Sequence, residues 1–146
     1  MQPKEKEIGF EIKVLSNLIK RAIGESIVDS GVEDMTGLHG MVIGFIYHRS
    51  KLADVYQRDI EVEFNIRRST VTGILQLMEK NGLITREHVK HDARLKKLKL
   101  TPKAIKLHEM ISQKIAEIEN QLRSGLTQEE IHSFFTIIDK IKKNIE

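Results

Sequence analysis

The chain has 146 residues, 40% hydrophobic and 31% charged, with a formal net charge of +3 at pH 7, which is typical of one soluble globular domain. The absence of cysteine excludes disulfides, thiol nucleophiles and cysteine metal ligands. No apolar run approaches the ~20 residues that a membrane span requires and no signal peptide is evident, so we expect a cytoplasmic protein without membrane contact.

The first predicted element is a long helix over about residues 5–30. Its apolar positions cover a broad side of the helix, which indicates more than one packing partner. They are Ile8, Ile12, Val14, Leu15, Leu18, Ile19, Ala22, Ile23 and Ile27. Residues 31–37 interrupt this pattern, and Thr36 is the predicted N-cap of a second helix that extends through Ile46.

Residues 57–83 predict two short helices joined by a tight turn at Asn65-Ile66. Asp59 lies in the first turn of the first of these helices, where a negative charge is favourable. The next helix has one buried stripe at i, i+3, i+4, i+7 spacing, formed by Val71, Ile74, Leu75 and Met78. Gly82 ends it, because glycine adopts the left-handed conformation at little cost.

The other side of this second helix is small, polar and cationic at its start. It consists of Arg67, Arg68, Ser69, Thr72, Gly73 and Gln76. Small residues permit close approach to the floor of a DNA major groove, and arginine can pair with guanine at two positions. An ordinary amphipathic helix pair has the same short pattern, so these residues alone favour DNA binding and a plain α domain about equally.

Two strands are predicted after the second helix, at Thr85–Val89 and Leu95–Leu100, with residues 91–94 as the link. Alternation places Leu98 and Leu100 on one side of the second strand and Lys97 and Lys99 on the other. The segment is therefore a hairpin with a basic outer side, which is typical of a wing.

The predicted tip of this hairpin has an arginine, Arg94, that could enter a DNA minor groove, where the potential is negative. Asp92 could hold Arg94 by a charge-assisted hydrogen bond. Residues 65–103 contain ten cations and three anions, a local charge of +7, so the rest of the chain sums to −4. Charge concentrated in this way indicates a polyanionic partner.

A long helix is predicted to begin at Thr101-Pro102 and to end before Gly125. Thr127 and Glu130 then predict a capping box for a last helix. The first helix and these two together have more apolar surface than the middle of the chain could cover, which indicates a second copy and a two-fold symmetric dimer. The fold class is therefore mainly α with a small β-hairpin wing, a winged helix-turn-helix with N- and C-terminal dimerisation helices.

The chain resembles the MarR family of dimeric winged-helix transcription regulators over nearly its whole length. The matching residues are Gln57 with Ile60, Ser69-Thr70-Val71-Thr72, Met78 with Gly82-Leu83-Ile84, Asp92 with Arg94, and Leu100-Thr101. The Asp-x-Arg wing followed by Leu-Thr-Pro is the most specific part. Two positions depart from the family pattern, since Glu61 stands where a small residue is usual and Tyr56 where a capping threonine is frequent.

The resemblance implies one domain over residues 1–146. A winged helix-turn-helix lobe at about residues 38–101 would bind DNA, and residues 5–30 and 102–146 would form the dimerisation region. Arg94 is the wing arginine by this resemblance. A small anionic or phenolic effector, bound between the dimerisation helices and the DNA-binding lobe, is an open alternative that the family suggests.

We therefore expect a sequence-specific transcriptional regulator, a repressor that binds double-stranded DNA as a homodimer on a palindromic operator. The expected DNA contacts are Arg67, Arg68, Ser69, Thr70, Thr72, Gln76, Arg94, Lys97 and Lys99. Asp92 is expected to support the wing.

Two alternatives stay open beside this reading. A winged helix used only for protein–protein contact would need an apolar or acidic outer face, whereas the face here is basic and small. A metal-responsive regulator of the same fold would use some of the six histidines, but none of them forms a compact motif such as His-x3-His. No phosphate loop, carboxylate pair or nucleophile–base pair is evident, so we expect no enzyme, no cofactor and no resident metal.

Overall fold

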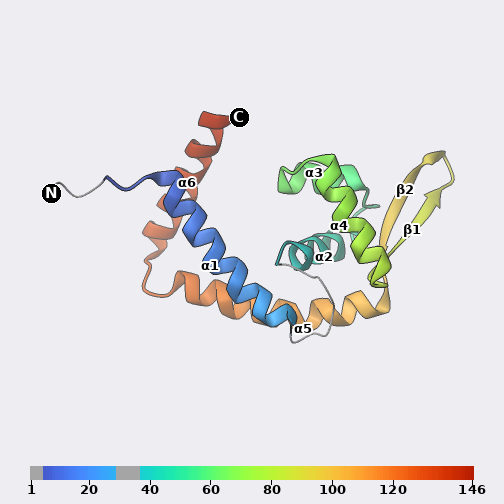
Figure 1. Ribbon diagram of the computed structural model, residues 1–146, viewed down its shortest axis with the longest axis horizontal. Helices are drawn as coiled ribbons and strands as arrows, with labels where there is room; N and C mark the ends of the chain where they lie inside the picture. Colours follow the sequence, from blue (N-terminus) through green and yellow to red (C-terminus); the bar gives the residue numbers. More distant parts are fainter. Residues whose placement is uncertain (1–4, 29–36) are drawn as a thin grey trace. The chain divides into compact units, whose positions relative to one another are not determined.

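The computed structural model describes residues 5–28 and 37–146. In this part of the chain, six helices and one antiparallel hairpin follow one another (Figure 1). They are α1 (Ile8–Val28), α2 (Gly37–Arg49), α3 (Gln57–Phe64), α4 (Arg68–Lys80), β1 (Ile84–Val89), β2 (Asp92–Leu100), α5 (Pro102–Arg123) and α6 (Gln128–Ile145). The predicted mainly α fold with a β-hairpin wing is confirmed.

The first helix begins later than predicted. Residues 5–7 have no regular secondary structure, and α1 starts at Ile8, with the Glu11 N–H donating to the Glu7 carbonyl at 3.0 Å. Thr36, the predicted N-cap of α2, lies outside the described residues. Where α1 meets α2, a Cβ added to Gly37 would lie 3.3 Å from Cγ2 of Ile23, so the glycine lets the two helices pack closely.

The chain divides into two compact units, Met1–Lys114 and Ile115–Glu146. Branched aliphatic side chains dominate the buried positions of the first unit, and most of them come from α2, α3, α4, the hairpin and the start of α5. The buried hydrophobic residues of this unit are Ile23, Val42, Ile43, Ile46, Val55, Ile60, Val71, Ile74, Leu75, Met78, Leu83, Ile84, Leu98, Ala104, Leu107 and Ile111. The apolar stripe predicted for α4 therefore faces this core.

The turn between α3 and α4 is at the predicted place. Asn65 has a left-handed backbone (φ 47°), and the N–H of Ile66 donates to the Glu61 carbonyl at 3.2 Å. At the other end of α3, the Asp59 carboxylate accepts the Tyr56 N–H at 2.8 Å, whereas the Tyr56 side chain makes no capping bond. An acidic residue three positions into the helix thus replaces the hydroxyl cap.

The hairpin turn differs from the prediction. It lies at residues 90–91, so the predicted link over residues 91–94 is wrong, and Asp92 and Arg94 belong to β2. The register shifts between His88 and Val89, because His88 pairs with Lys96 and Val89 with Asp92, so residues 93–95 of β2 have no paired residue in β1. Near its base the wing is attached to the segment before α3, because the Leu98 N–H donates to the Val55 carbonyl at 2.7 Å.

The end of α4 and the start of α5 are joined by one threonine. The Thr101 hydroxyl donates to the Gly82 carbonyl at 2.6 Å and accepts the Ala104 N–H at 3.2 Å, which makes it the N-cap of α5. The Thr101 N–H donates to the Leu83 carbonyl at 3.0 Å. Gly82 has a positive φ of 69°, as the predicted end of α4 requires.

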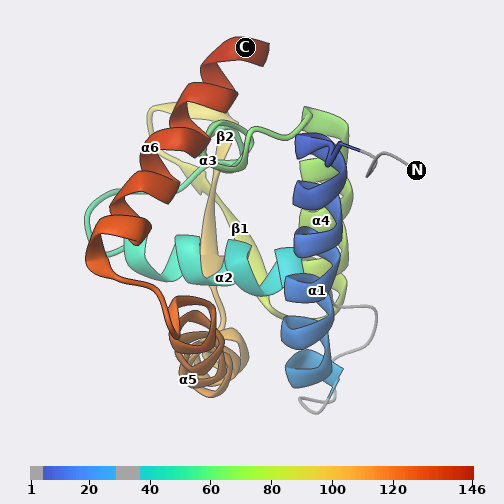
Figure 2. The ribbon, with the colours of Figure 1, turned by 90° about the vertical axis from the view of Figure 1, so that its left-hand side faces the viewer.

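The second unit contains the end of α5, a turn at Gly125 and α6, which Figure 2 shows in red. The predicted capping box is present: the Glu130 N–H donates to the Thr127 hydroxyl at 3.1 Å, and the Thr127 N–H donates to the Glu130 carboxylate at 3.0 Å. Among the helices described in both units, none combines the length and hydropathy of a bilayer span.

Candidate nucleic-acid interface

The start of α4 presents a row of polar and cationic side chains to solvent. Arg67, Arg68, Ser69 and Thr70 are all exposed there, and Gln76 is exposed two turns further along the helix. The first N–H groups of a helix have no intrahelical acceptor and carry a partial positive charge. Together with the two arginines, they make this end of α4 suitable for an anion.

Thr72, which was predicted on the same outward side, is only half-buried and has two partners. Its hydroxyl donates to the Arg68 carbonyl at 2.9 Å and accepts from Nε2 of Gln57 at 2.9 Å. Gln57 also approaches the Arg68 carbonyl, at 3.4 Å. The threonine therefore links α3 to the exposed end of α4, and one acceptor position of its hydroxyl stays available.

The wing has Arg94 near its tip, with a side chain that is 93% exposed. Asp92 lies beside it: Oδ1 accepts the Arg94 N–H at 2.9 Å and is 3.5 Å from the arginine Nε. The carboxylate thus contacts both the backbone and the side chain of Arg94, which restricts the directions that the guanidinium can take.

The two faces of the hairpin differ in charge. Opposite residues in the pairing share a face, so Arg86 with Leu98 and His88 with Lys96 lie on the face that includes the buried Leu98. Nε of Arg86 is 3.4 Å from a Glu79 carboxylate oxygen of α4, so this face is turned toward α4.

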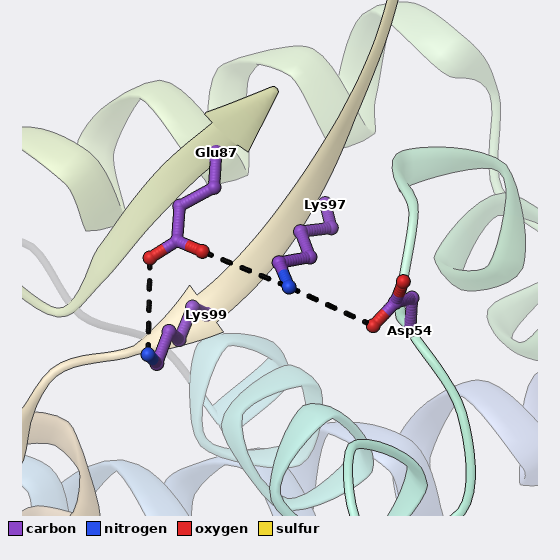
Figure 3. A network of polar contacts seen from close by, with 4 residues as sticks. All are labelled: Asp54, Glu87, Lys97 and Lys99. Carbon is purple, nitrogen blue, oxygen red and sulfur yellow. Dashed lines mark ion pairs between the residues drawn. The ribbon is translucent and has the colours of Figure 1, made fainter. Parts of the chain in front are cut away.

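The other face has the two lysines that the sequence singles out. Lys97 Nζ lies 3.8 Å from Glu87 and 3.9 Å from Asp54, and Lys99 Nζ lies 3.8 Å from Glu87 (Figure 3). Each lysine therefore has a carboxylate neighbour, and Asp54 belongs to the segment that precedes α3 rather than to the wing.

A groove of about 470 Å³ lies between α3, the start of α4 and the face of the wing that is turned toward α4. Its lining has five cations and one anion, and the complete lining is Tyr56, Gln57, Arg58, Glu61, Arg68, Arg86, Arg94, Leu95 and Lys96. A cationic, open groove of this kind suits a polyanion such as a nucleic-acid backbone.

The structure therefore brings Arg68 and Arg94 together in one groove, and it adds Arg58, Arg86 and Lys96, which sequence reasoning missed. One signal was available for Lys96, because strand alternation places it on the same side of β2 as Arg94. No local signal was available for Arg58, since its place in the groove depends on how α3 packs beside the wing.

A second group of polar rings lies away from the groove, between α2 and α5. The ring centroids of Tyr47 and His108 are 4.3 Å apart, and those of His48 and His108 are 5.6 Å apart. Lys51 Nζ lies 4.2 Å from the centroid of the Tyr47 ring. The pKa of His108 is lowered, mainly because the side chain is partly buried and also because His48 lies nearby. Within the described ranges, no three His, Asp or Glu side chains are grouped as a metal site would require.

Comparisons with known proteins agree with this geometry. A model of the MarR family matches residues 33–95. The transcription regulator MarR from Oenococcus oeni PSU-1 is 34% identical, covers 94% of this chain and 99% of its own, and has a TM-score of 0.79. S. aureus MepR, solved as a MepR–DNA complex, is 24% identical over 99% of this chain and 100% of its own, with a TM-score of 0.88. The heme sensor PefR from Streptococcus agalactiae, in complex with heme, is 24% identical. The match covers 96% of this chain and 95% of the PefR chain, with a TM-score of 0.65.

Proposed function

This chain belongs to the MarR family of winged helix-turn-helix transcription regulators, and on that premise we propose that it binds double-stranded DNA and represses transcription at a palindromic operator. The observation that supports DNA binding best is the cationic groove beside the exposed start of α4. Arg67, Arg68, Ser69, Thr70 and Gln76 are the proposed contacts of α4 in the major groove.

The wing arginine is the second part of the proposal. Arg94 is almost fully exposed and is oriented by Asp92, so its guanidinium can extend past the major groove that α4 would occupy. We propose that it enters the adjacent minor groove, where a narrow groove concentrates negative potential. Asp92 acts as its support and does not touch DNA.

The proposal includes a homodimer. Several large apolar side chains of α6 are about half exposed in the single chain, which is unusual for a soluble helix without a partner. We assign about residues 38–101 to DNA binding and residues 5–30 and 102–146 to dimerisation. Release by a small-molecule effector is part of the same proposal, supported at the level of the fold by the heme complex of PefR.

Selection of bound duplexes from a random DNA pool tests the proposed function. We expect enrichment of a two-fold symmetric sequence whose half-sites are about one helical turn apart, because a symmetric dimer presents two reading helices. Recovery of unselected sequences only, with no preference over bulk competitor DNA, would contradict sequence-specific regulation.

Replacing the wing arginine gives a sharper test of the site. Arg94→Ala should weaken binding to the selected duplex by about tenfold or more at ~150 mM salt, because it removes a charge placed at the DNA surface. Fluorescence anisotropy with a labelled duplex measures this change. The matched control is Arg49→Ala, which removes the same charge from an exposed position at the end of α2, outside the groove lining and outside the proposed dimerisation region. Equal affinities of the two variants would count against the wing contact.

A further inference from the structure

Two neighbouring lysines of β2 point to opposite faces of the wing. Lys96 lines the groove next to α3 and α4 and is exposed. Lys97, one residue later, lies on the other face and is only 35% exposed. The two side chains have the same charge and length, so their different surroundings alone decide what each can contact.

The groove face has an excess of positive charge. Its lining includes five cations against the single carboxylate of Glu61. Two of these cations have ion pairs with acids outside the lining, Arg86 with Glu79 and Arg94 with Asp92, which leaves an excess of positive charge. Arg58, Arg68 and Lys96 are exposed along it. A row of exposed cations beside a helix start favours a line of phosphates, since each contact releases a condensed counterion.

The opposite face is neutral. Its two lysines are matched by Glu87 and Asp54, with Lys97 between the two carboxylates (Figure 3). The pair between Lys97 and Asp54 also adjoins the backbone hydrogen bond from Leu98 to Val55. Residues 97–98 of the wing are thus attached to residues 54–55 by one ion pair and one backbone bond, immediately before α3 begins.

We propose that the DNA backbone runs along the groove and is contacted by Arg58, Arg68 and Lys96, whereas Lys97 is a positioning residue that fixes the angle of the wing. This inference rests on the proposed DNA-binding function and divides its cations into two roles. Lys99 belongs with Lys97, because its carboxylate neighbour is the same Glu87. The alternation of β2, and not the amount of positive charge, decides which lysine meets a phosphate.

The salt dependence of DNA binding distinguishes the two roles. A phosphate contact contributes about 0.9 to the slope of log affinity against log salt concentration. Lys96→Ala should therefore lower the slope by about 0.9 between about 50 and 200 mM salt, whereas Lys97→Ala should weaken binding with an unchanged slope. Lys97→Arg, which keeps both ion pairs, should restore the affinity. Thermal melting of each variant checks that the fold is intact.

A double-mutant cycle gives an independent readout. If Lys97 acts through Asp54, then Asp54→Ala also weakens DNA binding, and the double variant is no weaker than Lys97→Ala alone. If Lys97 instead touches a phosphate, removal of the neighbouring Asp54 should strengthen binding, because a negative charge near the DNA disappears. The second result would overturn the inference.

The remaining outcomes are equally distinct. A lower slope for Lys97→Ala, or an unchanged slope for Lys96→Ala, overturns the division of roles although the protein still binds DNA. A wild-type protein whose affinity for the selected duplex does not depend on salt contradicts the proposed function itself, whatever the variants do.

Discussion

A buried histidine makes the stability of the protein depend on pH. His39 of α2 is only 6% exposed, and burial lowers its pKa below the ordinary value of 6.5, because the charged imidazole loses its hydration. The unfolded chain therefore binds a proton more readily than the folded chain. Above pH 6.5, His39 should not change the free energy of unfolding. As the pH falls from 6.5 through the lowered pKa, the contribution of His39 should decrease the free energy of unfolding.

Urea unfolding at about pH 7.5 and 5.5 measures this dependence. We expect a lower free energy of unfolding at the acidic pH, and His39→Gln should remove part of the difference because glutamine does not titrate. His108 adds a dependence of the same sign, since its pKa is also lowered. If the free energy of unfolding of His39→Gln still differed between the two pH values as much as that of the wild type, the burial of His39 would not be a cause of the pH dependence.

The proposed contact residues show what single positions reveal in a sequence. Helical spacing places Thr72 on the outward side of α4, and it is there, but its hydroxyl is shared with Gln57 of the preceding helix. Strand alternation separates Lys97 from Leu98 correctly, but Asp54, 43 residues earlier, is invisible to it. Local periodicity predicts which way a side chain points and does not predict which distant group meets it.

The start of α6 depends on its capping box. Thr127→Ala removes the hydroxyl that accepts the Glu130 N–H and should lower the free energy of unfolding by about 1 kcal/mol. Thr127→Ser keeps the oxygen and should stay close to the wild type. Urea unfolding of the wild type and the two variants, all at the same protein concentration, measures the difference. Equal losses in the alanine and serine variants would mean that the methyl group, and not the cap, matters.

The elements were predictable to the degree that their signals are local. The order of six helices and one hairpin follows from periodicity, and the Thr101-Pro102 start of α5 and the Thr127 capping box follow from side chains within three residues of each helix start. The hairpin turn was missed because an irregularity of register leaves no mark on the alternation of residues. The groove depends on three elements packed together, so only the part of it at Arg68 and Arg94 was foreseen.

The complete molecule is proposed to act as a pair, and its mass in solution tests this. Sedimentation equilibrium should give twice the 16.8 kDa of one chain. Phe134→Glu, at a half-exposed position of α6, should dissociate the dimer and weaken operator binding, because a carboxylate is costly in an apolar interface. Leu52→Glu makes the same kind of change at a position that is 86% exposed in the loop after α2, and it should leave the mass unchanged. A dimeric Phe134→Glu protein would place the interface elsewhere.

The threonine between α4 and α5 has a mechanical consequence for regulation. One hydroxyl is bonded both to the carbonyl that ends the reading helix and to the N–H that begins α5. The Lys103 ammonium adds a second fastening, to the Asn81 carbonyl at 2.9 Å. These hydrogen bonds connect the first turn of α5 directly to the end of α4, the helix that we propose contacts DNA. Under the proposed function, a molecule that displaces the first turn of α5 would shift α4 and weaken DNA binding without contacting the proposed DNA-binding surface.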